Sequence, residues 1–565
     1  AVTGTNGKTT VVRLLSHMAS SGGAIVGTTC TEGIWIGKRR IDSGDCSGPA
    51  SARRVLANPS VTTAILETAR GGILREGLGF DRCDVAVVTN IGIGDHLGME
   101  EVDTVQRLAY VKSTIVSAVS SKGSAVLNAS DPLVVEMVRW CKGSVVYFST
   151  DPTCPVLVAH LAEGGLAATV REDFIVLCDG PRETRLASLD RVPLVHRGMV
   201  RFQVENVLAA SAAAWCLGVP LELVRGALES FDAGTNGSPA RFNIVDINGA
   251  SIVVDYGHNA SSLEEIISVL SVMPHERRTV IYSVAGDRRD EDLRAQGELL
   301  AGAFERIVIY EDAYIRGRKP GEITAILSEG VRRKETSARP IKIESGHGWN
   351  ESASRVLDSV RPGDLVLLQA DTVDGTMEWL AESYQGRLRE TTLDEAIGVP
   401  AGVHNRMPAH GDPVEVRWGR LGRELVATRS FSSGETVLKS WGPKTLKRTR
   451  HSMQVDTDTH IVPDGAMTFV NHSCNPNCGV IIRAGVEEIE VRTIRSIQAG
   501  EEITFDYESF EREVEFIKGP CLCQALNCRG RIVGHKNLQG DSSVRAEEFV
   551  AEYLRTSPVN APFKK

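Results

Sequence analysis

The motif that most constrains the fold stands at the start of the chain, where residues 4–10 read Gly-Thr-Asn-Gly-Lys-Thr-Thr. Glycines let a backbone wrap around a phosphate, the N–H groups at the start of a helix point at it, and Lys8 adds a positive charge. Thr9 is placed to ligate Mg²⁺. The motif therefore predicts a strand, a phosphate-binding loop and a helix. Because a strand normally precedes such a loop, we expect further sequence before Ala1.

The residues after this motif predict alternating strands and helices up to about Gly180. Apolar runs at Val61–Leu66 and Val85–Thr89 are typical of strands buried on both faces, as in a parallel sheet. Helices are predicted at Thr104–Val119, Val200–Leu217 and Leu221–Leu228. The first part of the chain is therefore expected to be an α/β domain.

A second α/β unit is predicted from about Ala240. Phe242–Ile247 and Ser251–Tyr256 flank Asn248-Gly249, which is a strong signal for a β-hairpin. Helical stretches then alternate with strand-like runs at Thr279–Val284, Arg306–Tyr310 and Asp364–Gln369. This alternation predicts a second doubly wound sheet.

The sequence pattern changes near residue 385. Residues 385–413 are rich in Gly, Pro, His and Asn and lack apolar periodicity, so we expect an extended and mobile linker. Short β-type segments follow at Val414–Trp418, Glu424–Thr428 and Glu488–Thr493. The chain is therefore predicted to continue as a mainly β domain.

The loop at residues 4–10 is shorter than the full G-x-x-x-x-G-K-[ST] pattern, because Val2 stands where the first glycine is expected. A glycine-rich turn before a helix is the alternative interpretation. The short form resembles the Mur ligase and folylpolyglutamate synthetase superfamily. Further segments that carry this resemblance, and that are similar to the ligase domain of cyanophycin synthetase, are Glu67-Thr68-Ala69-Arg70-Gly71-Gly72-Ile73-Leu74-Arg75, Thr89-Asn90-Ile91, Asp95-His96-Leu97-Gly98, Gly286–Asp292 and Arg316-Gly317-Arg318. The resemblance covers about residues 1–380.

The resemblance implies a role for residues of both α/β units. The ATP phosphates and a first Mg²⁺ would be held by Lys8 and Thr9, within a loop made with Gly4, Thr5, Asn6, Gly7 and Thr10. Glu67 would be a further ligand of this ion, and His96 would bind a second metal or orient the acceptor carboxylate. Lys112 takes the place of a lysine that many members carbamylate to obtain an anionic ligand. Asn206 would meet adenine, while the nucleotide would be faced from the second unit by Arg241, Asp255 and His258.

Considered without the family, these residues differ in how strongly they indicate function. Glu67 follows a predicted strand and so lies in the usual ligand crevice of such sheets. His96 beside Asp95 fits a structural ion pair equally well, and Lys112 alone would be a solvated lysine on a helix face.

The reaction that the resemblance implies is phosphorylation of a carboxylate by ATP, followed by attack of an amine on the acyl phosphate. The products are an amide, ADP and phosphate, and the expected substrates are an amino-acid or peptide carboxylate and an amino-acid amine. Positioning and charge neutralisation dominate such catalysis. Closure of the second domain is expected to exclude water. Cyanophycin synthetase uses this domain to add arginine to an aspartate side chain, but the resemblance does not carry the identity of the amine over to this chain.

Two further motifs stand near the C-terminus. Residues 469–477 read Phe-Val-Asn-His-Ser-Cys-Asn-Pro-Asn, and residues 499–507 read Ala-Gly-Glu-Glu-Ile-Thr-Phe-Asp-Tyr. With the cysteines that follow, they resemble the SET domain and its post-SET cluster over about residues 413–535. The resemblance implies an S-adenosylmethionine-dependent protein-lysine methyltransferase, with Asn471 and His472 against the cofactor and Tyr507 beside the methyl-transfer channel. Alone, Tyr507 would be interpreted as a half-buried packing residue.

One departure from the SET pattern concerns cofactor binding. The Gly-x-Gly turn of the family reads Gly422-Arg423-Glu424 here, so the second glycine is lost. The Cβ of Glu424 hinders a close approach of the backbone to S-adenosylmethionine.

The cysteines fall into two groups. Seven of the 12 are scattered singly before residue 220, which is typical of buried small residues in a reducing compartment and predicts a cytoplasmic protein. Three of the others have the spacing C-x-C-x₄-C, which leaves a tetrahedral Zn²⁺ site one ligand short. The SET resemblance implies that Cys474 completes a site formed with Cys521, Cys523 and Cys528. Free cysteines or a disulfide between Cys523 and Cys528 are the alternatives.

Length and composition bound the remaining possibilities. The chain of 565 residues is too long for one core. A net charge of −9 argues against a nucleic-acid partner, no apolar run is long enough to span a membrane, and no signal peptide opens the chain. We expect two Mur ligase domains at 1–238 and 239–385, a linker at 386–412, a SET domain at 413–512, a post-SET zinc segment at 513–535 and a tail at 536–565. An oligomer is compatible with this sequence.

Three functions are compatible with these motifs. The first is a bifunctional enzyme that joins an amide ligase to a lysine methyltransferase, and we prefer it. The second is an active ligase whose SET module only binds or regulates, which is motivated by Glu424. The third is a scaffold with an inactive ligase half, against which the intact Lys8, Thr9, Glu67 and His96 count.

Overall fold

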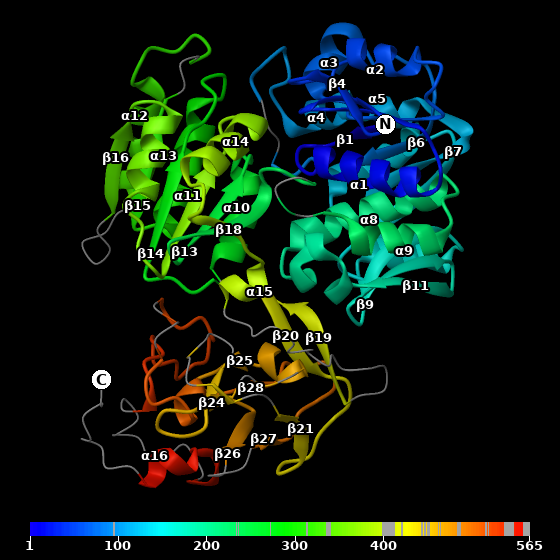
Figure 1. The fold of residues 1–565 in the computed structure, drawn as a ribbon. Coiled ribbons are helices and arrows are strands. Elements are labelled where there is room, and N and C mark those ends of the chain that lie inside the picture. Colours follow the sequence, from blue (N-terminus) through cyan, green and yellow to red (C-terminus); the bar gives the residue numbers. More distant parts are fainter. Residues whose placement is uncertain are drawn as a thin grey trace. The chain divides into compact units, whose positions relative to one another are not determined.

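The computed structural model describes residues 1–93, 97–232, 234, 237–271, 273–311, 315–334, 341–397, 413–419, 422–441, 444–445, 448, 452–461, 463, 465–482, 488–514, 517, 519–535 and 547–556. The chain forms two compact units, Ala1–Thr392 and Leu393–Lys565 (Figure 1). Among the described residues, no helix combines the length and the apolar character needed to cross a membrane.

The first domain of the N-terminal unit is built on a seven-stranded sheet with the order β1-β6-β7-β8-β9-β10-β11. Neighbouring strands from β1 to β9 are parallel, whereas β10 is antiparallel to both of its neighbours. The strands are β1 (Val2–Thr3), β6 (Cys83–Val88), β7 (Val119–Asn128), β8 (Ser144–Ser149), β9 (Leu166–Arg171), β10 (Phe174–Asp179) and β11 (Arg182–Ser188). The buried residues of these strands belong to two apolar clusters, one on each face of the sheet.

Helices cover both faces of this sheet (Figure 1). One cluster contains buried residues of α1 (Lys8–Ser21), α8 (Arg201–Cys216) and α9 (Leu221–Ser230). The other contains residues of α4 (Val105–Lys112), α5 (Thr114–Ser117), α6 (Pro132–Val135) and α7 (Pro155–Ala162). Three short 3₁₀ helices, η1 (Glu136–Trp140), η2 (Leu189–Arg191) and η3 (Pro193–Gly198), connect these elements. The alanine-rich α8 is buried along most of its length. Its small side chains allow it to pack closely against α1 and to support the loop that precedes α1.

A four-stranded sheet with the order β4-β3-β2-β5 lies beside the large one. It consists of β2 (Val26–Cys30), β3 (Gly33–Ile36), β4 (Arg39–Ser43) and β5 (Thr63–Leu66), with α2 (Pro49–Leu56) and α3 (Arg70–Glu76) next to it. The predicted strand at Val61–Leu66 is confirmed as β5, which pairs in parallel with β2 and is buried on both faces only at Ile65 and Leu66. This strand lies at the edge of the small sheet, and Thr63 and Ala64 are only half-buried.

The second domain is a seven-stranded sheet with the order β16-β15-β14-β17-β13-β12-β18. Its strands are β12 (Arg241–Ile247), β13 (Ala250–Asp255), β14 (Arg277–Tyr282), β15 (Arg306–Tyr310), β16 (Lys342–Gly346), β17 (Asp364–Gln369) and β18 (Leu388–Glu390). Its helices are α10 (Ala260–Leu270), α11 (Asp290–Ala303), α12 (Glu322–Lys334), α13 (Trp349–Leu357) and α14 (Val373–Ser383). The predicted hairpin is confirmed: β12 and β13 are antiparallel, and Asn248 and Gly249 both have positive φ, as a type I′ turn requires.

The C-terminal unit has short strands around one apolar core. They are β19 (Val414–Gly419), β20 (Gly422–Ala427), β21 (Thr436–Trp441), β22 (Lys444–Thr445), β23 (Met453–Gln454), β24 (His460–Ile461), β25 (Asn471–His472), β26 (Cys478–Ile482), β27 (Glu488–Thr493) and β28 (Thr504–Phe505). The helical elements are α15 (Leu393–Ala396), η4 (Gly465–Phe469), η5 (Tyr507–Ser509), η7 (Glu547–Phe549) and α16 (Glu552–Thr556). The prediction of a mainly β domain is confirmed.

Two predictions for the first domain are wrong in part. The single helix predicted at Thr104–Val119 is two helices, α4 and α5, because Ser113 and Thr114 hydrogen-bond back to the carbonyls of Tyr110 and Val111 at the break. The alternation predicted up to Gly180 stops at β9, since β9, β10 and β11 form an antiparallel meander.

The linker and the tail also contain structure that was not predicted. Leu388–Glu390, inside the predicted linker, pairs antiparallel with β12 as an edge strand, and three residues are too few to show a period. Residues 398–412 lie outside the described part of the chain. In the predicted tail, Phe549, Ala551 and Tyr553 are buried, and the last two belong to the core of the C-terminal unit.

Candidate functional site

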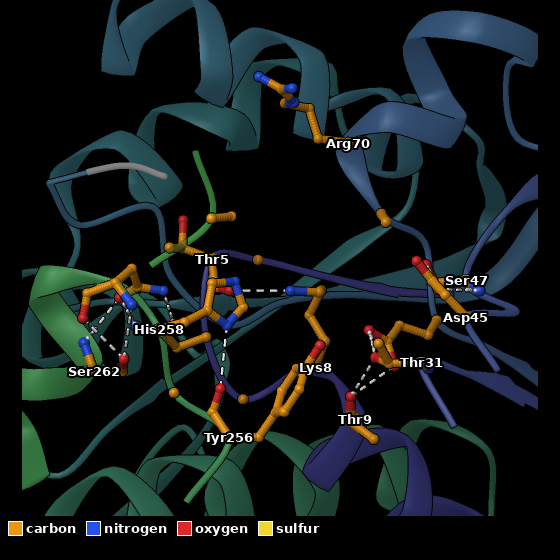
Figure 2. Close-up of a pocket in the computed structure, with 18 of the residues that line it drawn as sticks. Thr5, Lys8, Thr9, Thr31, Asp45, Ser47, Arg70, Tyr256, His258 and Ser262 are labelled. Carbon is orange, nitrogen blue, oxygen red and sulfur yellow. Dashed lines mark hydrogen bonds between the residues drawn. The ribbon is translucent and has the colours of Figure 1, made fainter. Parts of the chain in front are cut away.

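A cavity of about 660 Å³ lies where the loops after β1, β5 and β6 meet the second domain. Figure 2 shows Lys8, Thr9 and Thr31 from the first domain on one side, with Tyr256, His258 and Ser262 from the second domain opposite them. Such a volume suits a ligand of nucleotide size. The cavity is the feature around which most of the predicted residues gather.

The loop at residues 4–8 needs glycine at two positions. Gly4 and Gly7 have φ values of 148° and 82°. A Cβ at Gly4 would lie 1.9 Å from Oγ1 of Thr89, and one at Gly7 would lie 2.1 Å from Oδ1 of Asn206. The backbone therefore passes so close to its neighbours that a side chain cannot be accommodated.

Hydrogen bonds to the end of β6 fix this loop. The N–H groups of Thr5 and Asn6 donate to the backbone oxygen and to Oδ1 of Asn90, at 2.8 and 2.9 Å. The hydroxyl of Thr89 donates to the carbonyl of Asn6 at 2.6 Å, and Nζ of Lys8 donates to the carbonyl of Thr5 at 3.0 Å. Gly7, the residue before α1, has no side chain to cap the helix. The N–H groups of the first turn, which includes Thr9 and Thr10, therefore remain for a ligand in the cavity.

A buried group of oxygen atoms lies beside the loop. The carboxylate of Glu67, which is only 3% exposed, accepts hydrogen bonds from Oγ1 of Thr9 at 2.9 Å and from Oγ1 of Thr31 at 3.0 Å. The N–H of Thr31 donates to it at 3.2 Å. One carboxylate and two hydroxyls are the hard oxygen ligands that Mg²⁺ prefers, so these residues fit a divalent cation.

Lys112 and Asn206 support the loop from behind. Lys112 is 4% exposed, and its Nζ donates to the carbonyl of Gly4 at 2.6 Å. Asn206, on α8, faces Gly7 and donates to Oε1 of Gln203 at 3.0 Å. Both residues line the cavity.

Predicted residues of the second domain lie across the cavity. The guanidinium of Arg241 lies 5.1 Å from the ring centroid of Tyr256 and 3.8 Å from Oε1 of Glu32 in the first domain. Burial raises the pKa of Asp255 to about 6, although the N–H of Gly257 and the charge of Arg241 act in the opposite direction. Nδ1 of His258 lies 3.1 Å from the carbonyl of Tyr256.

The two domains are also linked directly at the loop. Nδ2 of Asn259 donates to Oδ1 of Asn6 at 2.8 Å, and Nδ2 of Asn6 donates to Oγ of Ser261 at 2.9 Å. Nearly all predicted residues of the N-terminal site are thus brought together. His96 lies outside the described residues, so its role stays a prediction.

Among the cavity residues that sequence reasoning missed are Thr31 and Glu205. Thr31 directly follows β2 in the run Thr28-Thr29-Cys30-Thr31, and nothing in its sequence context pointed to Glu67. Glu205 had a signal, because it is an acidic residue within an otherwise buried segment of α8. Burial, followed by the negative charge of Glu265, raises the pKa of Glu205 to about 7.

A second site forms in the C-terminal unit, where β25 and β28 pair in parallel and bring the two motifs together. The N–H of Tyr507 donates to Nδ1 of His472 at 3.3 Å, and the two rings meet edge to face at 5.3 Å. The Tyr507 hydroxyl donates to the carbonyl of Val470 at 2.9 Å. Asn471 is held by Glu502, with Nδ2 2.8 Å from Oε1.

Glu424, the departure from the glycine pattern, lies opposite Arg417 in the antiparallel pair β19–β20, and Gly422 is the first residue of β20. Nε of Arg417 donates to Oε1 of Glu424 at 3.0 Å. The carboxylate is therefore neutralised across the two strands.

A cluster of sulfur atoms adjoins Tyr507. The donor atoms of His472, Cys474, Cys521 and Cys523 lie within 4.8 Å of one another, and Sγ of Cys474 is 3.8 Å from Sγ of Cys521. The thiol of Cys528 hydrogen-bonds to both Cys521 and Cys523. Although burial opposes it, hydrogen bonds from the backbone of Cys474 and Ala525 and from neighbouring thiols lower the pKa of Cys523 to about 7.

Three of the four predicted cysteines therefore meet with His472, while Cys528 lies beside Cys521 and Cys523, and its Sγ accepts from the N–H of Gly530 at 3.4 Å. Cys523 and Cys528 are free cysteines, so the alternative of a disulfide between them is wrong. Thiolates and an imidazole at these distances are the ligand set that Zn²⁺ prefers.

Comparison with known families accounts for both units. The family model of the Mur ligase middle domain matches residues 2–214, and that of the Mur ligase, glutamate ligase domain matches residues 240–371. The model of the SET domain matches residues 422–508.

Similar proteins carry ligase names. The cyanophycin synthetase of Geminocystis herdmanii is 38% identical over 380 residues, which are 67% of this chain and 43% of that protein. The cyanophycin synthetase of Crocosphaera subtropica is 38% identical over 373 residues, 66% of this chain and 42% of that protein. The UDP-N-acetylmuramoyl-L-alanyl-D-glutamate–2,6-diaminopimelate ligase of Alkaliphilus metalliredigens is 24% identical over 67% of this chain and 72% of that protein. The chain thus spans less than half the length of the cyanophycin synthetases that it matches.

Proposed function

Because the chain belongs to the Mur ligase family in its N-terminal unit and carries a SET domain behind it, we propose that it is an ATP-dependent amide ligase joined to a lysine methyltransferase. The observation that carries the ligase proposal is the cavity in which Lys8, Thr9 and Glu67 face Arg241 and His258 of the second domain. Similarity to cyanophycin synthetases supports the same reaction class.

The phosphate loop supplies the charge and the hydrogen bonds that a triphosphate needs. Lys8 contributes a positive charge, and the first-turn N–H groups of α1 donate toward the cavity. Thr9 and Glu67 would hold a magnesium ion, which supplies positive charge next to the phosphates. These groups stabilise the charge that develops while a phosphoryl group is transferred to a carboxylate oxygen.

The second domain completes the cavity. Arg241, Asp255 and His258 line it from the side opposite the loop, and the Asn6–Asn259 pair ties the two domains together beside it. Such closure keeps water away from an acyl phosphate until the amine attacks. The amine nitrogen then forms the amide bond, and phosphate leaves.

The expected substrates are an amino-acid or peptide carboxylate and an amino-acid amine. To test this, the purified chain is incubated with ATP, Mg²⁺, short aspartate- and glutamate-containing peptides and each of the standard amino acids, and ADP is measured. ADP should form only when a matched acceptor and amine are both present. ADP formation that is the same with and without them would contradict the proposal.

For the C-terminal unit we propose S-adenosylmethionine-dependent methyl transfer to a protein lysine. Asn471 and His472 are positioned by the β25–β28 pair, and Tyr507 is held by His472 and Val470. Similarity to the SET domain over residues 422–508 supports this proposal over a module that only binds or regulates.

We also propose that Cys474, Cys521, Cys523 and Cys528 hold one Zn²⁺, which would cross-link the segment after the SET core. Cys523→Ser should release the metal and disorder that segment, whereas Cys478→Ser, at a buried cysteine outside the cluster, should retain it. Elemental analysis of the purified proteins measures this. Wild-type protein that contains no zinc after purification without a chelator would contradict the assignment.

A further inference from the structure

The residue after the last cysteine of the cluster makes an unusual contact. Nη2 of Arg529 lies 2.7 Å from Oδ2 of Asp506 and also 2.7 Å from Oε2 of Glu508. These two carboxylates flank Tyr507 in sequence. Their side chains are only 2% and 1% exposed, whereas that of Arg529 is 28% exposed. One guanidinium nitrogen therefore bridges the residues on either side of the tyrosine.

The same arginine is attached to the cysteine cluster. Its neighbour Cys528 hydrogen-bonds to Cys521 and Cys523, and its own N–H donates to Sγ of Cys474 at 3.5 Å. The main chain of Arg529 thus follows the cluster, while its side chain reaches the tyrosine segment. Any displacement of the cluster moves the guanidinium away from two buried carboxylates.

Asp506 caps the backbone that begins at Tyr507, and Glu508 ties this segment to the residues that follow the cluster. Oδ1 of Asp506 accepts from the N–H of Glu508 at 3.0 Å and so caps η5, which begins at Tyr507. Oε1 of Glu508 accepts from the N–H groups of Val533 and Gly534 at 2.9 and 3.1 Å. A movement of either carboxylate therefore shifts the backbone of Tyr507, which lies between the two residues.

We propose that Arg529 is a positioning residue that couples the cysteine cluster to Tyr507, so that the tyrosine takes its working orientation only when the cluster is intact. Two buried carboxylates that lost this arginine would be left without its charge, which is unfavourable in a low-dielectric site. They would turn toward water and take the backbone of Tyr507 with them. The inference rests on the proposed methyltransferase function for its consequence, but the coupling itself is a property of the fold.

Three full-length variants test the coupling. Arg529→Lys keeps the positive charge but places it on a shorter side chain, away from the position at which Nη2 meets both carboxylates. The triple variant Arg529→Met, Asp506→Asn, Glu508→Gln removes the bridge without leaving a buried carboxylate unpaired. Arg492→Lys is the matched control, because Arg492 is also 28% exposed and lies 2.7 Å from Glu490.

The first measurement needs no enzyme activity. Hydrogen–deuterium exchange of residues 505–510 is compared with the metal bound and after removal by a chelator, with zinc content measured in parallel. In the wild type and in Arg492→Lys, metal removal should speed exchange of this segment. In zinc-bound Arg529→Lys the segment should already exchange at the fast rate, whereas in the triple variant, which has neither the bridge nor an unpaired carboxylate, its exchange should not depend on the metal.

The second measurement uses methyl transfer from labelled S-adenosylmethionine to poly-L-lysine. In Arg529→Lys, kcat should fall by about 100-fold while the affinity for S-adenosylmethionine is nearly unchanged, because a misplaced tyrosine affects the chemical step. Wild-type exchange and wild-type kcat in zinc-bound Arg529→Lys would overturn the inference, as would loss of zinc from Arg529→Lys. If the wild type neither binds S-adenosylmethionine nor transfers methyl groups, the proposed function fails, and the exchange measurement still decides the coupling.

Discussion

Lys8→Ala should lower ATP-dependent amide formation by about 100- to 1,000-fold, because removing one preorganised group that stabilises transition-state charge has an effect of this size. The side chain of Lys8 lines the cavity and is only half-buried, and its hydrogen bond to the carbonyl of Thr5 lies within the loop. Its removal should therefore leave the fold intact. Release of ADP and formation of amide are measured at saturating ATP, and thermal unfolding reports the fold.

Glu67→Gln tests the same site from the metal side. Gln keeps the shape and an oxygen that can accept from Thr9, but it removes the negative charge next to the cation. We expect a similar loss of activity and a higher requirement for Mg²⁺. Lys122→Ala, at an exposed lysine of β7 that does not line the cavity, is the matched control and should behave like the wild type. A Lys8→Ala protein that makes ADP at the wild-type rate would contradict the assignment of the cavity as the ATP site.

Tyr507→Phe should abolish methyl transfer and leave ligase turnover unchanged. The phenol oxygen, which donates to the carbonyl of Val470, is lost, while the ring keeps its contacts with His472 and Phe505. Since positioning supplies most of the acceleration in such a transfer, we expect a loss of about 100-fold or more. The unchanged packing means that stability should hardly differ.

We expect the two activities to be independent because each unit has its own apolar core. The two domains of residues 1–392 have their own apolar clusters, and the C-terminal unit has another. Both reactions are therefore assayed in the Lys8→Ala and Tyr507→Phe proteins, and the two units are also expressed alone. If either substitution disables both reactions in correctly folded protein, the activities are coupled and this expectation is wrong.

Local motifs predicted much of the cavity because a phosphate loop uses neighbouring residues. Gly4, Gly7, Lys8 and Thr9 act within one turn of backbone, so their spacing already contains the geometry. Thr31 could not be predicted in this way. It reaches Glu67 only because β2 and β5 pair in register, and that pairing depends on the tertiary fold.

The same distinction holds for secondary structure. The Asn248-Gly249 hairpin follows from the φ preferences of two residues, and it was predicted correctly. The β9–β11 meander and the edge strand β18 form through pairing with neighbouring strands. Their segments are short and show no clear period, so the sequence did not predict them. Burial of Tyr553 against the SET core likewise depends on a distant surface, since its hydroxyl donates to the carbonyl of Phe510.

In the C-terminal unit, the cysteine spacing indicated the cluster but not its connection to Tyr507. In the pattern Cys-Arg-Gly, Arg529 stands directly after the last cysteine of the cluster. Nothing in this pattern predicts that its side chain contacts Asp506 and Glu508. This contact requires the segment after the cluster to fold back on η5. The N–H groups of Val533 and Gly534 hold it there by donating hydrogen bonds to the carboxylate of Glu508.

The most direct test of the central claim follows the oxygen atoms of the acceptor. A carboxylate acceptor that supports ADP formation is labelled with oxygen-18 in its carboxyl group and incubated with ATP, Mg²⁺ and the matching amine. If the cavity forms an acyl phosphate, each amide bond leaves one labelled oxygen in the released phosphate, which mass spectrometry detects. Amide formation accompanied by unlabelled phosphate would contradict the account.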